Sequence, residues 1–182
     1  MHTMGIVRLL LVGLCLAPLM GRADVVLVDR IAASVDLHPI TRSAVEIRAR
    51  PLLAVAKSDA QKEEVRRAVL LELIEEALIR KEAERLGIEM RDAEVEAALG
   101  EVAKQNQLTV AELVAEIQRQ GLDLQQYKTM LRAKLLELRW LNARMNHAKA
   151  PADEAARVTF TASERTRLLN ELRLGAVIEV RP

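Results

Sequence analysis

Hydrophobic and polar residues follow the two-residue period of a β-strand only near the two ends of the chain. The stretch from Val25 to Val35 is rich in β-branched residues, and its second half, Arg30–Val35, alternates as a half-buried strand does. Ala176–Arg181 alternates Ile and Val with Glu and Arg. Because Pro39 lacks an amide donor, the extended piece at residues 40–41 is expected on a sheet edge. The pattern predicts a small β-sheet formed by N- and C-terminal strands.

Between these strands apolar residues recur every three or four positions, which predicts a mostly α-helical fold. Each expected helix begins at a residue whose side-chain oxygen accepts hydrogen bonds from free backbone amides. In chain order these capping residues are Ser43, Ser58, Asp92, Thr109, Asp123 and Ser163. Ser43, Ser58 and Thr109 form capping boxes with a Glu or Gln three residues later. The expected ends lie near Pro51, at Leu86 before Gly87, at Gly121 and at Gly175.

Two of the expected helices carry apolar stripes that place them inside a helical bundle. The helix from Ser58 to Leu86 is apolar on more than one side, so we expect other elements to surround it. Its main stripe consists of Leu70, Leu71, Ile74, Ala77 and Leu78. The helix that begins at Asp123 has a heptad stripe of Leu124, Leu131, Leu138 and Met145. A short tail helix with Leu168, Leu169 and Leu172 is expected to dock on this body.

The first residues have the pattern of an export signal. Arg8 precedes an apolar run, Leu9–Met20, and Gly21-Arg22-Ala23 places small residues at the −3 and −1 positions of a cleavage site. The run is shorter than the roughly 20 residues that a membrane-spanning helix needs. We therefore expect a signal peptide over residues 1–23, cleaved before Asp24, and an exported protein without stable membrane insertion. An uncleaved anchor is the alternative.

Composition narrows the classes of partner. The chain has 182 residues, 51% hydrophobic and 29% charged, which suits one folded domain. Loss of residues 1–23, with Arg8 and Arg22, changes the formal net charge from +1 to −1, so no electrostatic footprint for nucleic acid is expected. Trp, Tyr and Phe occur once each, too few for a base-stacking platform. Cys15 lies in the expected signal, so the mature chain has no disulfide.

Residues capable of chemistry do not gather into a recognisable motif. The candidates are His38, His147, Glu72, Glu75, Glu76, Ser43 and Ser163. The histidines lack metal-ligand spacing and are interpreted as a turn residue and a helix-end cation. The three glutamates are interpreted as a solvated helix edge, and the two serines as caps. No catalytic residue, no metal site and no cofactor is predicted, so the chain is not expected to be an enzyme.

The order of elements resembles a known family. The strand VDRIAASV, the turn ITRS and the stretch LGIEMRDAEVEAALGEVAKQNQLTVAELVAEIQRQGLDLQQYKTMLRAKLLELR are similar to the N-terminal domain of SurA-like periplasmic chaperones. The resemblance covers Val28 to Asn146, and its most specific part runs from Ala103 through Gly121 to Tyr127. Ser163–Val180 is similar to the helix and strand with which such chains return to the N-terminal domain.

The chain departs from this family in one large respect. SurA-like chains usually carry parvulin prolyl-isomerase domains before the closing strand, whereas here Ala148–Thr161 occupies that place. The resemblance therefore implies a linker over 148–161 and no isomerase. Asp36, Ala44 and Arg91 replace residues more usual in the family, which is expected to weaken local capping. The expected organisation is a signal peptide over 1–23, a SurA N-terminal-like domain over 24–147, the linker, and a returning helix and strand over 162–182.

The function implied by this resemblance is an ATP-independent periplasmic chaperone, or holdase. Its partners would be unfolded envelope polypeptides, including outer-membrane proteins. A non-catalytic adaptor or dimerisation module for one folded partner is the alternative, and an active prolyl isomerase is a third hypothesis against which the missing domain argues. Flexible Met side chains suit varied clients, but Met90, Met130 and Met145 are interpreted first as core residues. The sequence assigns no peptide-binding residue and no oligomeric state.

Overall fold

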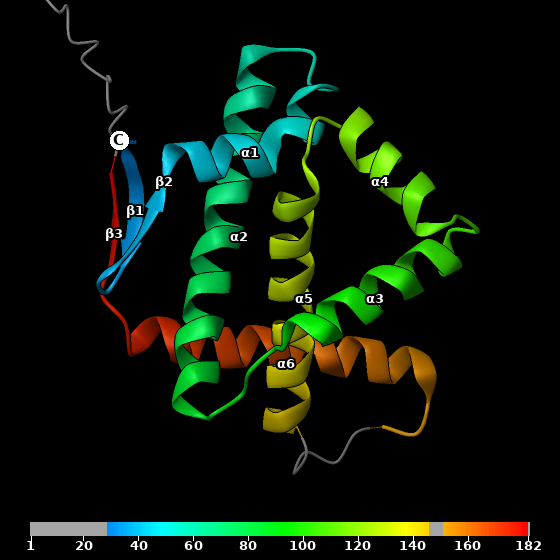
Figure 1. The fold of residues 1–182 in the computed structure, drawn as a ribbon. Coiled ribbons are helices and arrows are strands. Elements are labelled where there is room, and N and C mark those ends of the chain that lie inside the picture. The colour runs from blue at the N-terminus through cyan, green and yellow to red at the C-terminus, as the bar shows by residue number, and fades with distance from the viewer. Residues whose placement is uncertain (1–28, 146–150, 182) are drawn as a thin grey trace, which may run out of the picture.

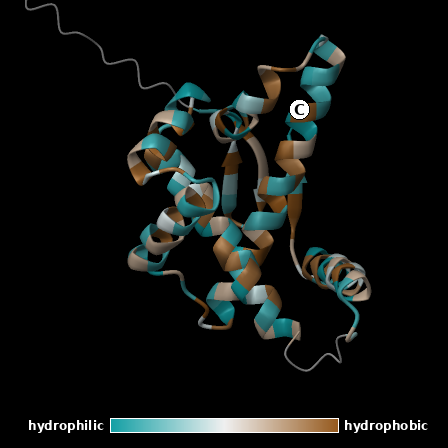
Figure 2. Ribbon diagram, turned by 90° about the vertical axis from the view of Figure 1, so that its right-hand side faces the viewer, coloured by the Kyte–Doolittle hydropathy of each residue, from teal (hydrophilic) through white to brown (hydrophobic). Residues whose placement is uncertain are grey.

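A computed structural model describes residues 29–145 and 151–181, which form six helices and three strands (Figure 1). In chain order these are β1 (Ile31–Val35), β2 (His38–Thr41), α1 (Arg42–Leu53), α2 (Asp59–Arg85), α3 (Asp92–Gln105), α4 (Val110–Arg119), α5 (Leu124–Met145), α6 (Glu154–Leu174) and β3 (Ile178–Val180). Figure 2 shows hydrophobic and hydrophilic residues interspersed along the helices. The fold is mostly α-helical with one small sheet, as predicted.

The sheet joins the two ends of the described chain. Its strand order is β2-β1-β3 with both pairs antiparallel, and Ala33 of β1 lies opposite Ile40 of β2 and Val180 of β3. The Asp36 carboxylate accepts hydrogen bonds from the Val177 amide, at 2.9 Å, and from Lys81 of α2, at 2.5 Å. The predicted sheet and the edge position of β2 are therefore confirmed. Strands β1 and β3 are shorter than predicted, whereas β2 is longer because His38 and Pro39 belong to it rather than to the turn. Residues 25–28 lie outside the described residues.

Helix α2 is the central element, as predicted from its apolar faces. It contacts α1, α5, α6 and the sheet (Figure 1). Ile74 and Leu78 pack in a cluster with residues of β1, β2 and α1, whereas Ile79 packs in a second cluster with Trp140 of α5. Leu71 was predicted to share the buried stripe but is 52% exposed, so the elements that the structure describes leave that side of the helix partly uncovered.

The covered side of α5 also differs from the predicted heptad stripe. Trp140 and Leu141 are its buried residues, while Leu138 is 48% exposed. Helix α5 packs against α3 and α4 along one part and against the α6 cluster near its end, so one straight stripe does not describe its contacts. The heptad prediction is therefore wrong at Leu138.

The C-terminal helix is longer than predicted. It begins after Asp153, whose carboxylate accepts a hydrogen bond from the Ala156 amide at 2.8 Å. Ser163 lies inside this helix and donates to the Phe160 carbonyl, so it is not a cap. Helix α6 also occupies residues 154–161 of the expected linker. Periodicity missed this first half because its residues are largely exposed and carry no apolar stripe.

Several helix starts also depend on residues other than those predicted. At α1 the cap is Thr41, which accepts from the Ala44 amide, while Ser43 donates to Asp29. At α3 the capping position holds Arg91, whose amide donates to the Glu94 carboxylate at 2.9 Å. The caps Ser58, Thr109 and Asp123 are confirmed, as is Gly87, with φ of +67°, after α2. The caps at Ser43 and Asp92 were wrong.

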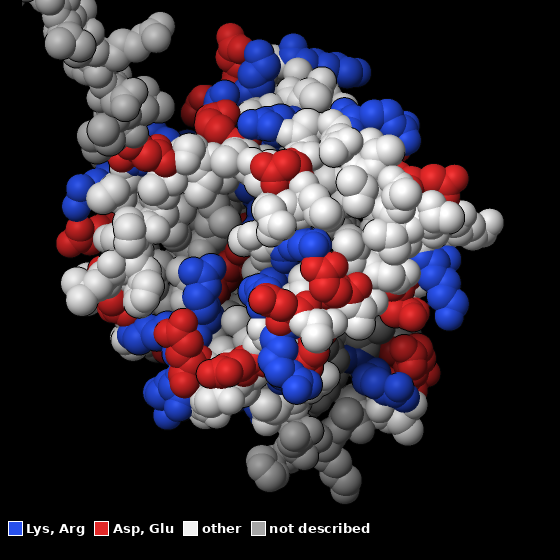
Figure 3. Space-filling view, in the orientation of Figure 1, with Lys and Arg blue, Asp and Glu red and all other residues white. Residues whose placement is uncertain are grey.

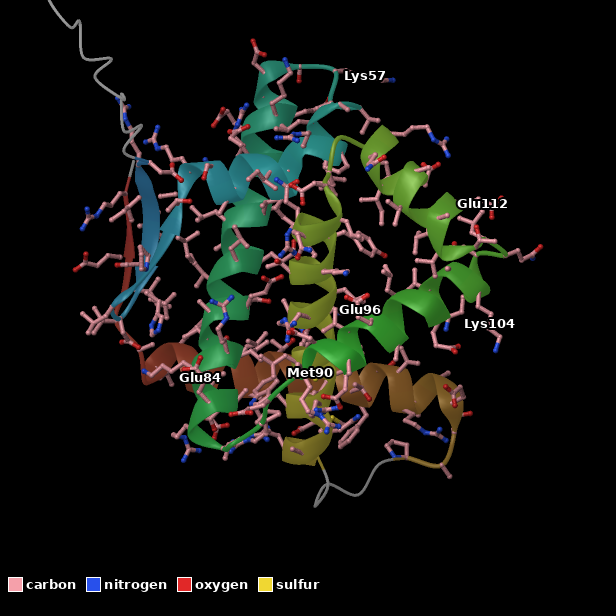
Figure 4. The ribbon with its side chains drawn as sticks, in the orientation of Figure 1. Lys57, Glu84, Met90, Glu96, Lys104 and Glu112 are labelled. Carbon is pink, nitrogen blue, oxygen red and sulfur yellow. The ribbon has the colours of Figure 1, made fainter. Side chains whose placement is uncertain are left out.

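Helices α3 and α4 and the first part of α5 enclose a cluster of their own on the side away from the sheet (Figure 1). Its buried members are Leu99, Ala103, Leu113, Ile117 and Leu122. Glu94 ties α3 to α5, because its carboxylate accepts from Arg139 at 2.7 Å. Lys128 of α5 forms a second link to Glu96, which Figure 4 labels on α3.

The ion pair between Glu94 and Arg139 should make part of the folding stability depend on pH. Hydrogen bonds from Arg139 and from the Arg91 amide lower the pKa of the Glu94 carboxyl from 4.5 to about 2. Because the folded pKa is depressed, this stabilisation is present above about pH 4.5 and is lost as the pH falls toward 2. We expect Glu94→Gln to lower the melting temperature at pH 7, and its difference from the unmodified protein to shrink over that interval.

Thermal unfolding followed by circular dichroism at a series of pH values measures this difference. Glu101→Gln is the matched control, because Glu101 is an exposed glutamate on the same helix. The control variant should have the same melting temperature as the unmodified protein at every pH. A Glu94→Gln difference that stayed constant down to pH 2 would contradict the assigned role.

Candidate functional site

Two adjoining cavities open between α1, α2, α5 and α6. The larger, of about 330 Å³, lies between β2, α1, α2 and α5, and the smaller, of about 260 Å³, continues it toward α6. Both are lined by Arg48, Glu76 and Met130, so they form one groove, which we call the α2 groove. Figure 3 shows the surface hollowed between the strand side and the α5 side.

Helical spacing explains why these residues face the same space. On α1, α2 and α5 the residues that line the larger cavity are one to four positions apart and share one face of each helix. They are Ala44, Ile47 and Arg48 of α1, Leu73, Glu76 and Arg80 of α2, and Gln126, Thr129 and Met130 of α5. Strand β2 adds Ile40, which is buried. The groove thus combines an apolar floor with polar walls.

A partly buried ion pair lies in the part that the two cavities share. The Arg48 guanidinium donates to both carboxylate oxygens of Glu76, at 2.8 and 3.0 Å, and to Glu72 at 3.2 Å. Burial raises the pKa of the Glu76 carboxyl, and the Arg48 guanidinium opposes part of that rise. The groove therefore contains charged groups that already satisfy one another.

A second set of ion pairs closes the α6 end of the groove. Arg165 of α6 donates to Glu75 at 3.0 Å and also to Glu137 of α5, and Arg173 donates to Glu75 at 2.6 Å. Burial would raise the pKa of Glu137, but hydrogen bonds from Lys134 and Arg165 lower it below its ordinary value. These contacts tie α6 to α2 and α5.

The three glutamates of α2 were predicted to form a solvated edge, and that prediction is wrong for two of them. Glu75 and Glu76 are each partly buried and paired with arginines, and only Glu72 is exposed. No histidine among the described residues lines the groove beside them. Their arrangement fits structural ion pairs between helices.

The other candidate residues are dispersed. His38 is exposed at the start of β2, and His147 lies outside the described residues. None of the three methionines is fully buried: Met130 lines the groove, Met145 packs beside Trp140, and Figure 4 shows Met90 in the connection that leads into α3. The sequence singled out Glu72, Glu75, Glu76 and Met130 but assigned none of them to a client-binding groove. The lining positions come from five elements and have no common period.

The part of the chain that the structure describes contains neither a metal-binding cluster nor a membrane-spanning helix. Within residues 29–145 and 151–181 no group of three or more His, Cys, Asp or Glu side chains is arranged to hold a metal ion. Over the same ranges, none of the helices combines the length and the apolar character needed to cross a bilayer.

Comparison with known proteins defines the family. The model of the SurA N-terminal domain matches residues 28–140, more than half of the chain. The chain therefore belongs to the SurA N-terminal domain family.

Individual relatives are longer proteins. Chaperone SurA of Bordetella pertussis is 36% identical over 113 residues, which are 58% of this chain and 21% of that protein. Chaperone SurA of Vibrio cholerae is 28% identical over 146 residues, 76% of this chain and 34% of that protein. The chain thus spans about a fifth to a third of these relatives.

A solved structure is also similar. It comes from work describing the virulence factor PEB4 and the periplasmic protein Cj1289 of Campylobacter jejuni as two structurally related SurA-like chaperones. The match has a TM-score of 0.45 and 22% identity, and covers 76% of this chain and 51% of the other.

Proposed function

We propose that this protein is an ATP-independent chaperone that holds unfolded polypeptides in the α2 groove. The observation that carries the proposal is the groove itself, whose apolar floor consists of the buried Ile40 and the partly exposed Ile47, Leu73 and Met130. Its larger cavity has a volume within the range of known ligand sites. Membership of the SurA N-terminal domain family and similarity to proteins named chaperone SurA support the same function.

The chemistry of the groove suits many clients rather than one. Arg48 and Glu76 neutralise each other, so a client need not supply a charge at that point. Met130 has a flexible thioether side chain that adapts to apolar groups of different shapes. Binding would therefore depend on exposed apolar side chains, which unfolded chains share and folded proteins conceal.

The proposal includes a location and a class of client. The chain is exported after cleavage before Asp24, acts in the periplasm and binds envelope proteins, including unfolded outer-membrane proteins. Prolyl isomerisation is not part of the proposed function, since only residues 146–153 separate α5 from α6 where larger relatives are expected to carry an isomerase. Helix α6 and β3 act as part of the client-binding domain.

The test is suppression of aggregation of a urea-unfolded outer-membrane barrel after dilution, without ATP. Thr129→Asp places a charge on the groove wall and should weaken suppression by about fivefold, as expected when a carboxylate is set against apolar surface. Thr166→Asp is the matched control. Both threonines are exposed on helices and donate to the carbonyl four residues earlier.

Light scattering measures the delay at several ratios of chaperone to client. If both variants lost aggregation suppression equally, the groove would not be the client-binding site. If the unmodified protein did not delay aggregation at molar excess, the chaperone function would be contradicted. Capture of a single folded partner at fixed stoichiometry would favour the adaptor hypothesis. Accelerated X-Pro exchange by the same sample would contradict the absence of isomerase activity.

A further inference from the structure

A second hollow, which we call the arginine cavity, lies where the sheet meets α1 and the first half of α2. Its volume is about 590 Å³, and it shares no lining residue with the α2 groove. Helix α1 separates the two, because Val45 and Glu46 face the arginine cavity while Ala44 and Ile47 face the groove. The arginine cavity is therefore a distinct place for a ligand.

The charge around this cavity is positive. Its lining contains four arginines and two glutamates: Arg42, Arg66, Arg67, Arg181, Glu46 and Glu63. Both glutamates are already engaged by one arginine, Arg66, at 2.6 Å each. The lining arginines therefore outnumber the lining glutamates by two.

Two of those arginines are available to a ligand. Among the described residues, Arg67 makes no hydrogen bond or ion pair, and it is exposed. Within the described part of the chain, Arg181 forms one ion pair, with Glu179 at 3.8 Å, which is beyond hydrogen-bond distance. A planar guanidinium binds a carboxylate through two parallel hydrogen bonds, which makes such an arginine selective for that group.

The remaining lining is apolar. Ala32 and Val45 are buried at the floor, Leu70 is half-buried, and Val180 on β3 is 60% exposed. This surface lies beside the arginines, so a ligand that fills the cavity must present an apolar side chain next to its negative group. A small inorganic anion would leave the apolar floor uncovered.

We infer that the arginine cavity binds an unfolded polypeptide segment in which a carboxylate stands beside an apolar side chain. The carboxylate is either the C-terminus of the client or an Asp or Glu side chain, since both present the same group. The inference rests on the proposed function only in taking the ligand to be an unfolded chain. The arginine cavity would thus be a second client-binding site, separate from the α2 groove and with its own selectivity.

The test compares three fluorescein-labelled peptides of one apolar sequence by fluorescence anisotropy. The first has a free C-terminal carboxylate, the second is amidated, and the third is amidated with a Glu before its last residue. The first and third should bind about threefold to tenfold more tightly than the second, as expected for one hydrogen-bonded contact with an exposed, solvent-screened arginine. Tighter binding of the first alone would assign the cavity to chain ends, and of the third alone to acidic side chains.

Arg67→Gln should abolish this preference while leaving the affinity for the amidated peptide unchanged. Arg119→Gln, which removes an exposed arginine on α4, is the matched control and should keep the preference. A preference that survives in Arg67→Gln overturns the inference, as does Arg67-dependent binding of anionic phospholipid vesicles with no preference among peptides. If the unmodified protein binds none of the three peptides, the proposed function is overturned as well.

Discussion

Replacing both Leu168 and Leu169 by alanine should lower the free energy of unfolding by at least about 4 kcal/mol, since each buried Leu→Ala change costs about 2–5 kcal/mol. Each leucine is only 2% exposed, and both pack with Ile79 of α2 and Trp140 of α5. A domain of this size is stable by roughly 5–15 kcal/mol, so the variant should be close to unfolding. Urea denaturation followed by circular dichroism measures the change.

The matched control is Leu174→Ala, at the end of the same helix. Leu174 is 91% exposed, so its truncation should leave the urea midpoint within experimental error of the unmodified protein. An unchanged midpoint in the double variant would mean that α6 does not dock on the helical body. In that case its ion pairs at the end of the α2 groove would also be absent.

Trp140→Ala should lower the free energy of unfolding by about 3–5 kcal/mol. Trp140 is fully buried in the cluster where α2, α5 and α6 meet, and no other side chain of that cluster is as large. Its ring fills the space between Ile79 and the paired leucines of α6, so alanine leaves a cavity. Tryptophan is absent from this variant, and denaturation must be followed by circular dichroism.

Trp140→Phe separates packing from hydrogen bonding. The Trp140 Nε1 is buried and has no hydrogen-bond partner among the described residues. Because Phe keeps much of the ring and removes an unsatisfied donor, its cost should be clearly smaller than that of Ala. A Phe variant as unstable as the Ala variant would show that the indole N–H is satisfied in solution.

Features encoded by neighbouring residues were predictable from the sequence. The boundaries of α2 follow from Ser58, which binds the amide of Gln61, and from Gly87, which adopts a positive φ after the helix. The capping box of Thr109 and Glu112 is local in the same way. The strands at the two ends were predictable because alternation marks each one, and each is too short to be stable alone. The family resemblance followed from the same segments.

Features that depend on distant residues were decided only by the tertiary structure. Ser43 and Thr41 are equally suited to cap α1, and the choice depends on Asp29, which takes the Ser43 hydroxyl. Leu71 and Leu138 fit their stripes by spacing, yet they are 52% and 48% exposed in the described structure. Their exposure depends on how neighbouring elements pack, and periodicity along one helix does not contain that information.

The α2 groove and the arginine cavity also depend on residues that are far apart in the sequence. The α2 groove takes residues from β2, α1, α2, α5 and α6, and the arginine cavity joins Arg67 of α2 to Arg181 beyond β3. In the sequence these arginines are unremarkable members of a nearly neutral chain. The sequence by itself determined most of the helices, the caps at Ser58, Thr109 and Asp123, and the strands that pair. The tertiary structure decided which side chains share a cavity, because that depends on packing between segments far apart in the chain.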